Sequence, residues 1–286
     1  MKNILLAAIL TIFCTDSSAQ VNSVENSFEA LNPKVERGSV LVFQISSKQM
    51  NPASNPTVFV FKKEYKPNSQ GLVFVGVDLK EQLGTQFAMF NENNPKPGWG
   101  YQQIEVLKAS FCKTRTSAYS GKPKPRTDRQ KKIIDNVYAK ADKSVDLTSG
   151  LKYIDPLYFA DDVIDPFGLI YRNNPYREHR GVDLGAKVGT RVVAVNSGRV
   201  ILVAKKFRQE GNMVIVNHGL GIFSVYMHLS KFNVKEGDVV GRGQLVAWSG
   251  HTGAGVREPH LHFGVKIHDS YVDSLRFIET VNSVLK

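Results

Sequence analysis

The sequence has little cysteine, and histidine is missing from more than half of the chain. Cys14 and Cys112 are the two cysteines among 286 residues, and no histidine precedes His179. The H-E-x-x-H motif is also absent, which excludes the helical zinc site that this motif builds in many metalloproteases. Any imidazole chemistry must therefore come from the C-terminal part and use another arrangement of residues.

The N-terminus lacks an apolar run long enough to anchor the chain in a bilayer. Its apolar stretch, Ile4 to Phe13, is shorter than the roughly 20 residues that a membrane-spanning helix needs. Together with the small residues that follow, it predicts a secretory signal peptide over residues 1–19, cleaved after Ala19. We therefore expect an exported protein, periplasmic or secreted, with no transmembrane segment after cleavage. Lipidation of Cys14 is a minor alternative, and cleavage leaves Cys112 without a disulfide partner.

Acidic side chains are fewer than basic ones. The 26 aspartates and glutamates against 37 lysines and arginines give a formal net charge of +11. A basic exported protein is expected to adsorb to anionic polymers. Nucleic acid, anionic lipid and the carboxylate-rich bacterial wall all meet this condition, so charge alone does not choose the partner.

Residues 28–112 contain short β-rich runs between turn signals and no histidine. The strand candidates are "GSVLVFQIS", "TVFVFKKEY", "GLVFVGVDL" and "QFAMF". Short strands at this spacing predict a small β-sandwich-like domain. Because it has no catalytic constellation, we expect this domain to bind, space or cover something.

Residues 113–150 are expected to be a basic linker followed by a short helix. Eight lysines and arginines against one aspartate occupy residues 113–132. Behind a Thr127 or Asp128 cap, apolar residues recur at helical spacing: Ile133, Ile134, Val137, Tyr138 and Ala141. An amphipathic helix is therefore predicted after the linker.

Residues 151–286 read as a compact, mainly antiparallel β domain. Strand-like runs alternate with glycine turns, and no long helix is expected before the last dozen residues. All seven histidines lie here, between residues 179 and 268. Three of them, His218, His251 and His268, are in turn contexts or just past a strand, and we expect them not to be metal ligands.

The remaining histidines and one aspartate form a candidate metal constellation. His179 and Asp183 are four residues apart in "HRGVD", and His260 and His262 alternate in "PHLHFGV". Two imidazoles and one carboxylate make a typical catalytic zinc set with an open fourth position. His179, Asp183 and one histidine of the pair complete such a set. The other histidine and His228 then remain for proton transfer and oxyanion stabilisation.

Five segments in order carry a resemblance to a known family. They are "DPFGLIYR", "HRGVDLGAKVGTRVVAVNSGRV", "GNMVIVNHGLGIFSVYMHLS", "VKEGDVVGRGQLVAWSGHTG" and "PHLHFGV". From about Ile164 to Ile267 the chain resembles the lysostaphin-type (LytM-type) zinc metallopeptidases, which cut the peptide cross-bridges of peptidoglycan. The resemblance implies a mainly β fold: an antiparallel β-sheet groove of the duplicated-hybrid type, beside the small N-terminal domain.

Carried over residue by residue, the resemblance implies the roles of single side chains. It implies that His179, Asp183 and His262 bind zinc, and that His228 and His260 are the catalytic histidines.

Two further residues are expected to contact substrate. Arg172 lies near a position where the family often has a substrate-facing polar residue. Tyr226 alternates with His228 and is expected to line the same groove.

The implied function is an exported zinc metalloendopeptidase that hydrolyses peptidoglycan peptide cross-links, with D-Ala to diaminopimelate bonds as the expected target. The hypothesis is that zinc brings the pKa of water toward about 7 and that His260, or His228 in its place, removes the proton. The main alternative is a non-catalytic wall-binding protein or an activator of other peptidoglycan hydrolases. A lipoyl-like carrier is not expected, because this sequence lacks the lysine hairpin that such a carrier needs. Nucleic-acid binding is not expected either, because it rests on charge alone. The N-terminal domain and linker are expected to target the wall or to cover the groove.

Overall fold

The computed structural model describes residues 28–46, 50, 55–91, 99–111, 125–159, 162–170, 178–254 and 256–286. The predicted signal peptide at 1–19, both cysteines, most of the basic linker and Arg172 lie outside these ranges. The chain is mainly β, as predicted, and none of the helices in the described ranges is long and apolar enough to span a membrane.

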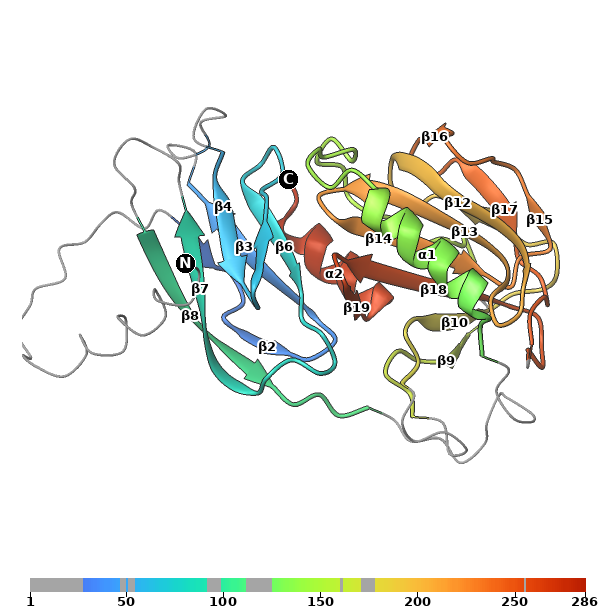
Figure 1. Ribbon diagram of the computed structural model, residues 1–286, viewed down its shortest axis with the longest axis horizontal. Helices are drawn as coiled ribbons and strands as arrows, with labels where there is room; N and C mark the ends of the chain where they lie inside the picture. The colour runs from blue at the N-terminus through green and yellow to red at the C-terminus, as the bar shows by residue number, and fades with distance from the viewer. Residues whose placement is uncertain are drawn as a thin grey trace, which may run out of the picture.

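The C-terminal part is built on an eight-stranded sheet in the order β16-β12-β13-β14-β18-β10-β9, with β19 also pairing β18 (Figure 1). Every pairing in this sheet is antiparallel, as the alternating runs and glycine turns predict. The strands are β9 (Val163–Asp165), β10 (Val182–Gly185), β12 (Gly198–Phe207), β13 (Gly211–Gly219), β14 (Ile222–Met227), β16 (Val239–Val240), β18 (His260–Ile267) and β19 (Ser270–Val272). A small second sheet has the order β11-β17-β15, made of β11 (Arg191–Val193), β15 (Lys231–Phe232) and β17 (Leu245–Trp248).

The N-terminal strands form two further sheets. One has the order β1-β3-β6, with β1 (Phe28–Ala30), β3 (Val40–Ile45) and β6 (Leu72–Gly76). The other has the order β2-β8-β7-β4-β5, with β2 (Lys34–Glu36), β4 (Thr57–Val60), β5 (Lys63–Tyr65), β7 (Gly84–Asn91) and β8 (Trp99–Leu107). The ring of Phe28 contacts the rings of Phe43 and Phe90, so the two sheets meet through aromatic side chains.

One buried core joins the N-terminal sheets to the C-terminal part. It runs from strand β1 to helix α2 (Ser274–Val284), whose N-cap is Asp273. A Cβ added at Gly76 in β6 would lie only 3.1 Å from the Cβ atoms of Ile267 and Ser270. The two parts share this core, so the core does not divide the chain into separate units. The domain boundaries at 28–112, 113–150 and 151–286 stay a prediction.

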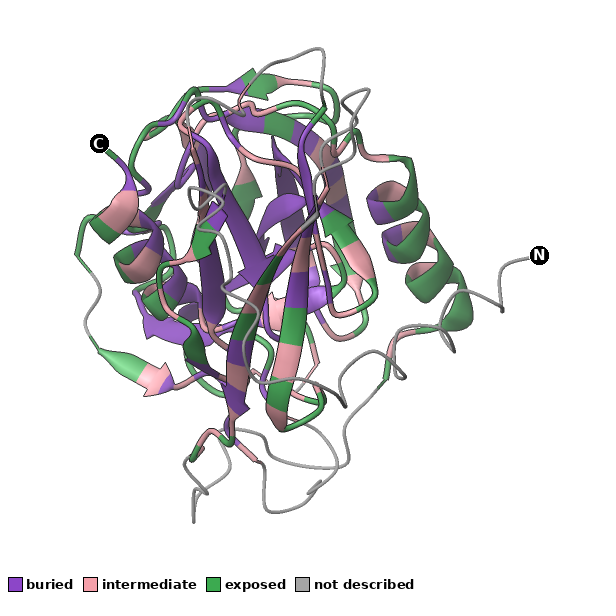
Figure 2. Cartoon of the chain, turned by 90° about the vertical axis from the view of Figure 1, so that its left-hand side faces the viewer, coloured by how far each residue is buried: buried purple, intermediate pink, exposed green. Residues whose placement is uncertain are grey.

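The predicted helix is present as α1 (Asp128–Lys140). Thr127 is the N-cap, and its side chain and that of Gln130 form a capping box with each other's backbone N–H groups. Exposed residues lie on the outer side of α1 and buried ones toward the sheet (Figure 2). The apolar spacing therefore predicted the helix and its buried face correctly.

Helix α1 covers the face of the eight-stranded sheet that is opposite to the main core. Tyr138 packs edge-on against Phe223 of β14, and the Lys266 ammonium lies 3.9 Å from the Tyr138 ring centroid. On β18, Lys266 has the same parity as His260 and His262, so all three side chains point to this face. We call it the site face.

Candidate metal centre

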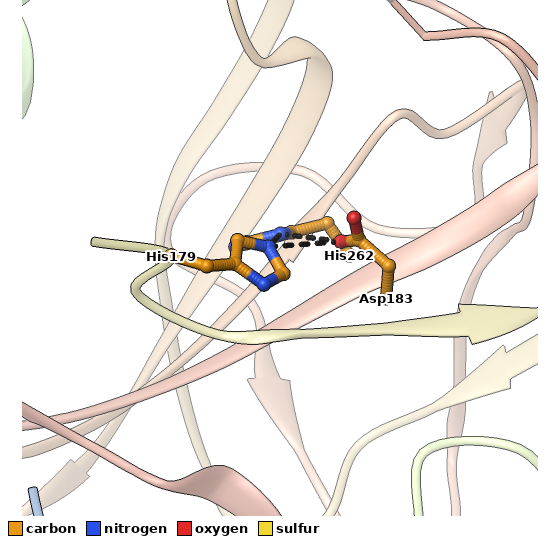
Figure 3. Close-up of side chains that lie close together, drawn as sticks. All are labelled: His179, Asp183 and His262. Carbon is orange, nitrogen blue, oxygen red and sulfur yellow. Dashed lines mark hydrogen bonds and ion pairs between the residues drawn. The ribbon is translucent and has the colours of Figure 1, made fainter. Parts of the chain in front are cut away.

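The three predicted ligands meet where β10 and β18 run side by side (Figure 3). Asp183 is the register partner of His262, so both side chains project from the same side of the sheet. His179 lies three residues before β10 and is clamped by two backbone hydrogen bonds with Gly168 and Leu169, each 2.9 Å long. The "DPFG" turn therefore fixes the direction from which His179 approaches.

The three candidate ligand atoms form a compact triangle. His179 Nε2 lies 3.0 Å from His262 Nδ1 and 3.2 Å from Asp183 Oδ1, and the third edge, from His262 Nδ1 to Asp183 Oδ1, is 2.8 Å. In a tetrahedral zinc site with ligand distances of about 2.0–2.2 Å, two ligand atoms are about 3.3 Å apart or slightly more. The observed spacing is a few tenths of an ångström tighter, which small side-chain rotations remove, so the triangle fits one ion.

The surrounding backbone prepares these atoms for ligation. The Pro166 carbonyl lies 3.0 Å from His179 Nδ1, and since a carbonyl only accepts, this nitrogen donates and leaves a lone pair on Nε2. Such a hydrogen bond on the far nitrogen is typical of histidines that bind metals. The donor set of two nitrogens and one carboxylate oxygen suits zinc.

The electrostatics of the triangle favour an ionised aspartate. Burial raises the pKa of Asp183, but the charges and hydrogen bonds of His179 and His262 outweigh it and lower this pKa well below its usual range. Burial lowers the pKa of His262. Burial also opposes a proton on His179, but Asp183 and the Pro166 carbonyl outweigh it and raise the pKa of His179. These shifts favour the ionised Asp183 and the neutral His262 that ligation requires, whereas the raised pKa of His179 means that a metal ion competes with a proton there.

His228 and His260 lie beside the triangle. The His228 ring centroid is 4.9 Å from that of His260 and 5.9 Å from that of His262. Each Nδ1 donates to a backbone carbonyl at 2.8 Å, from His228 to Thr252 and from His260 to Glu258. Both rings therefore keep Nε2 available as a base when neutral.

The two Nε2 atoms of this pair differ in what surrounds them. His260 Nε2 is buried, lies 3.7 Å from Asp183 Oδ1 and has no hydrogen-bond partner among the residues that the structure describes. Burial is the main cause that lowers the pKa of His228 to about 3, and the neighbouring His260 and His262 lower it further. The structure thus gathers all five side chains named from the sequence, with both spare imidazoles next to Asp183 and His262.

The prediction for Tyr226 is wrong. Its side chain is fully buried on the opposite face, where its hydroxyl accepts from the Val195 N–H at 3.1 Å and lies 3.0 Å from the Ser224 hydroxyl. The alternation rule failed because His228 has a φ of 63°, which turns its ring out of the strand pattern toward His260. Arg172 lies outside the described residues, so its role stays a prediction.

The other three histidines are not in the triangle. His218 is buried, with Nδ1 2.8 Å from the Ser197 carbonyl and Nε2 2.8 Å from the Ser224 hydroxyl, so it is backbone-bonded but not solvent-facing. His251 is exposed, and the half-buried His268 ring packs against Tyr65.

Two residues near the triangle were missed from the sequence. Asp165 pairs with Asp183 across β9 and β10 and is buried, with no hydrogen-bond partner for Oδ2 in the described ranges. Burial, with the Asp183 charge adding to it, raises the pKa of Asp165. Gly181 touches His262, since a Cβ there would lie 2.6 Å from His262 Nε2. Asp165 could have been noticed as the acid of the "DPFG" segment, whereas no local sequence pattern indicated Gly181.

A buried His-Asp-His triangle on an antiparallel sheet, flanked by two free imidazoles, defines the class as a metallopeptidase-type site. Residues 177–274 match the model of peptidase family M23, so the chain carries a domain of this family. The predicted resemblance to the lysostaphin-type family is therefore confirmed over these residues.

Curated relatives match about a third of the chain. The chain is 41% identical over 99 residues to an uncharacterized metalloprotease of Haemophilus influenzae, covering 35% of this chain and 21% of the relative. It is 37% identical over 98 residues to the peptidoglycan DD-endopeptidase ShyB of Vibrio cholerae, covering 34% and 22%. Lysostaphin of Staphylococcus simulans is 43% identical over 86 residues, covering 30% and 17%. The chain thus spans about a fifth of the length of these relatives.

One solved structure matches most of the chain. A putative M23 peptidase from Pseudomonas aeruginosa aligns with a TM-score of 0.64 and 26% identity, covering 85% of this chain and 94% of that chain. The likeness therefore extends well beyond residues 177–274 and includes N-terminal strands.

Proposed function

We propose that this protein is an exported zinc metalloendopeptidase that hydrolyses peptide cross-links of bacterial peptidoglycan, with D-Ala to diaminopimelate bonds as its target. The observation that carries the proposal is the His179, Asp183 and His262 triangle with two free imidazoles beside it. The names of the relatives support the substrate class, because they include a peptidoglycan DD-endopeptidase and lysostaphin.

The residues divide the work between holding the ion and moving protons. His179, Asp183 and His262 would hold a zinc ion, which when bound supplies Lewis-acid polarisation of a peptide carbonyl and acidification of water. His260 Nε2 then accepts the proton of the attacking water, because its Nδ1 is committed to the Glu258 carbonyl. The protonated His260 then returns this proton to the leaving amine, and His228 donates to the developing oxyanion in its imidazolium form, which the negative charge of the oxyanion favours.

Metal and activity can be tested together on purified protein. We expect about one zinc per chain by elemental analysis, and release of peptide-linked fragments from purified peptidoglycan, detected by mass spectrometry. A chelator should stop the release and added zinc should restore it. Unchanged peptidoglycan with the fully zinc-loaded protein would contradict the enzyme and favour the wall-binding or activator alternative.

The division of labour predicts a specific phenotype for His260→Ala. Because His260 is outside the triangle, we expect the variant to retain zinc and to lose about 10²- to 10⁴-fold in kcat, the usual range for a general base. His262→Ala is the comparison and should lose the zinc itself. If His260→Ala lost zinc but kept partial activity, the two roles would have to be exchanged.

A further inference from the structure

Glu210 has a fully buried carboxylate and is joined to the candidate site through its backbone. It directly precedes β13, its side chain has no exposed surface, and one oxygen, Oε1, forms an ion pair with the guanidinium of Arg126. The other oxygen, Oε2, has no hydrogen-bond partner among the described residues. A buried carboxylate with one oxygen unsatisfied is costly and needs a reason.

The backbone connects Glu210 directly to the candidate catalytic histidine. The His228 N–H donates to the Glu210 carbonyl at 3.0 Å, and His228 Nδ1 donates to the Thr252 carbonyl. The Thr252 hydroxyl in turn accepts from the N–H of Asn212, two residues after Glu210, at 2.9 Å. Glu210 is therefore held in the same rigid frame as the His228 ring.

The cation that pairs with the Glu210 carboxylate comes from the segment before α1 and not from the sheet. Arg126 stands just before α1, within the predicted basic linker, and its side chain is 32% exposed while that of Glu210 is 0% exposed. Arg126 thus reaches from the surface into a preformed acidic position. A primary ammonium has three N–H donors on one nitrogen and suits a carboxylate that still has a free oxygen.

We propose that the Glu210 carboxylate is the binding site for a primary ammonium group of the substrate peptide, and that Arg126 is an internal occupant which leaves when substrate enters. This rests on the proposed function. A diaminopimelate residue of a donor stem retains a free amine one residue from the bond to be cut, so the predicted substrate carries the required group. Specificity then comes from a side chain outside the metal centre.

The test compares two cross-linked stem-peptide dimers that differ only in whether this amine is free or acetylated. For the zinc-loaded wild type, we expect kcat/KM to favour the free amine by about tenfold or more, the usual contrast for a charge-assisted hydrogen bond. Glu210→Gln should bring the ratio close to one. Arg126→Gln should lower KM for the free-amine dimer only, since the internal competitor is removed.

The control is Asp135→Asn, which removes one negative charge from an exposed ion pair with Lys131 on α1 and should leave the ratio unchanged. Zinc content and thermal unfolding show that each variant is folded. Cleavage with an unaltered ratio in folded Glu210→Gln would overturn the subsite and leave the proposed function intact. If Glu210→Gln does not fold, Arg126→Gln decides, and an equal KM change for both dimers overturns the subsite.

A wild type that cleaves neither dimer would contradict the proposed function. In that case, titration calorimetry with the same two dimers tests the subsite separately. Preferential binding of the free amine, lost in Glu210→Gln, would support it, and equal binding would overturn it.

Discussion

At the scale of single residues, Gly181 shows how closely the candidate ligands are packed. It lies between His179 and Asp183, and a Cβ there would be 2.6 Å from His262 Nε2 and 2.7 Å from the Phe263 carbonyl oxygen. We expect Gly181→Ala to displace the His262 ring and to weaken zinc binding about 10- to 100-fold, as loss of ligand support usually does. Competition titration with a chromophoric chelator measures this.

The matched control for this substitution is Gly241→Ala. Nothing lies within 4 Å of a Cβ at Gly241, so zinc affinity should not change there. Equal affinities for the two alanine variants would show that His262 tolerates displacement and that the tight packing has no role in metal binding.

His218 gives a prediction on acid stability. Burial lowers the pKa of His218 from 6.5 to about 4, so below pH 6.5 the unfolded chain binds a proton that the folded chain does not. The stability that neutral His218 supports is therefore complete above about pH 6.5 and is lost as the pH falls toward 4. At about 1.4 kcal/mol per tenfold change in proton affinity, this loss is on the order of 3 kcal/mol.

Urea unfolding of the wild type and of His218→Gln at pH 7 and pH 5 measures this effect. The variant should be less stable at pH 7, because the bonds to Ser197 and Ser224 are lost, but it should lose less stability between the two pH values. The exposed His251→Gln is the control and should follow the wild type. Parallel pH profiles for wild type and His218→Gln would contradict the assignment.

The residues also show what the sequence could and could not predict. His179, Asp183, His260 and His262 were identified because their spacing is short and local. Tyr226 was misplaced because the left-handed backbone at His228 breaks the strand alternation. Pairs such as Arg126 and Glu210, 84 residues apart, depend on how α1 docks on the sheet, which no local pattern encodes.

At the scale of elements, α1 occupies the site face beside the candidate metal centre. Its buried residues Ile134 and Tyr138 pack on apolar side chains of β12, β13 and β14. The spacing of apolar residues predicted the helix, but not the face of the sheet that it covers. Among the residues of the linker region that the structure describes, α1 is the element that we expect to restrict access to the site.

The N-cap of α1 allows this restriction to be tested without deleting any residue. Thr127→Ala removes the capping box and should destabilise α1 by about 1 kcal/mol. We expect amide hydrogen exchange over Asp128–Lys140 to become about fivefold faster, since 1 kcal/mol is about a factor of five. If α1 restricts access to the site, kcat/KM of Thr127→Ala for cross-linked substrates should also rise.

Thr127→Ser keeps the capping oxygen and serves as the control for both measurements. Faster exchange in Thr127→Ala with unchanged kcat/KM would exclude α1 as a cover. The predicted role of this region would then be reduced to wall targeting.

At the scale of the whole molecule, the shared core predicts joint unfolding. Because buried residues from β1 to α2 form one cluster, we expect a single calorimetric transition with equal calorimetric and van't Hoff enthalpies. Gly76→Val should lower the midpoint of that one transition by several degrees, since even a Cβ there is 3.1 Å from Ile267 and Ser270. Two separate transitions would show that the N-terminal sheets fold independently.

Strand β18 has a consequence for how such a protein can vary. Its even-numbered side chains include His260 and His262, and its odd-numbered ones, Leu261, Phe263, Val265 and Ile267, fill the main core. Inserting or deleting one residue within the strand would exchange the two sets and bury the imidazoles among apolar side chains. Insertions and deletions in this region are therefore tolerated only in the loops at either end of β18. Within the strand, the site and the core can change only by substitution.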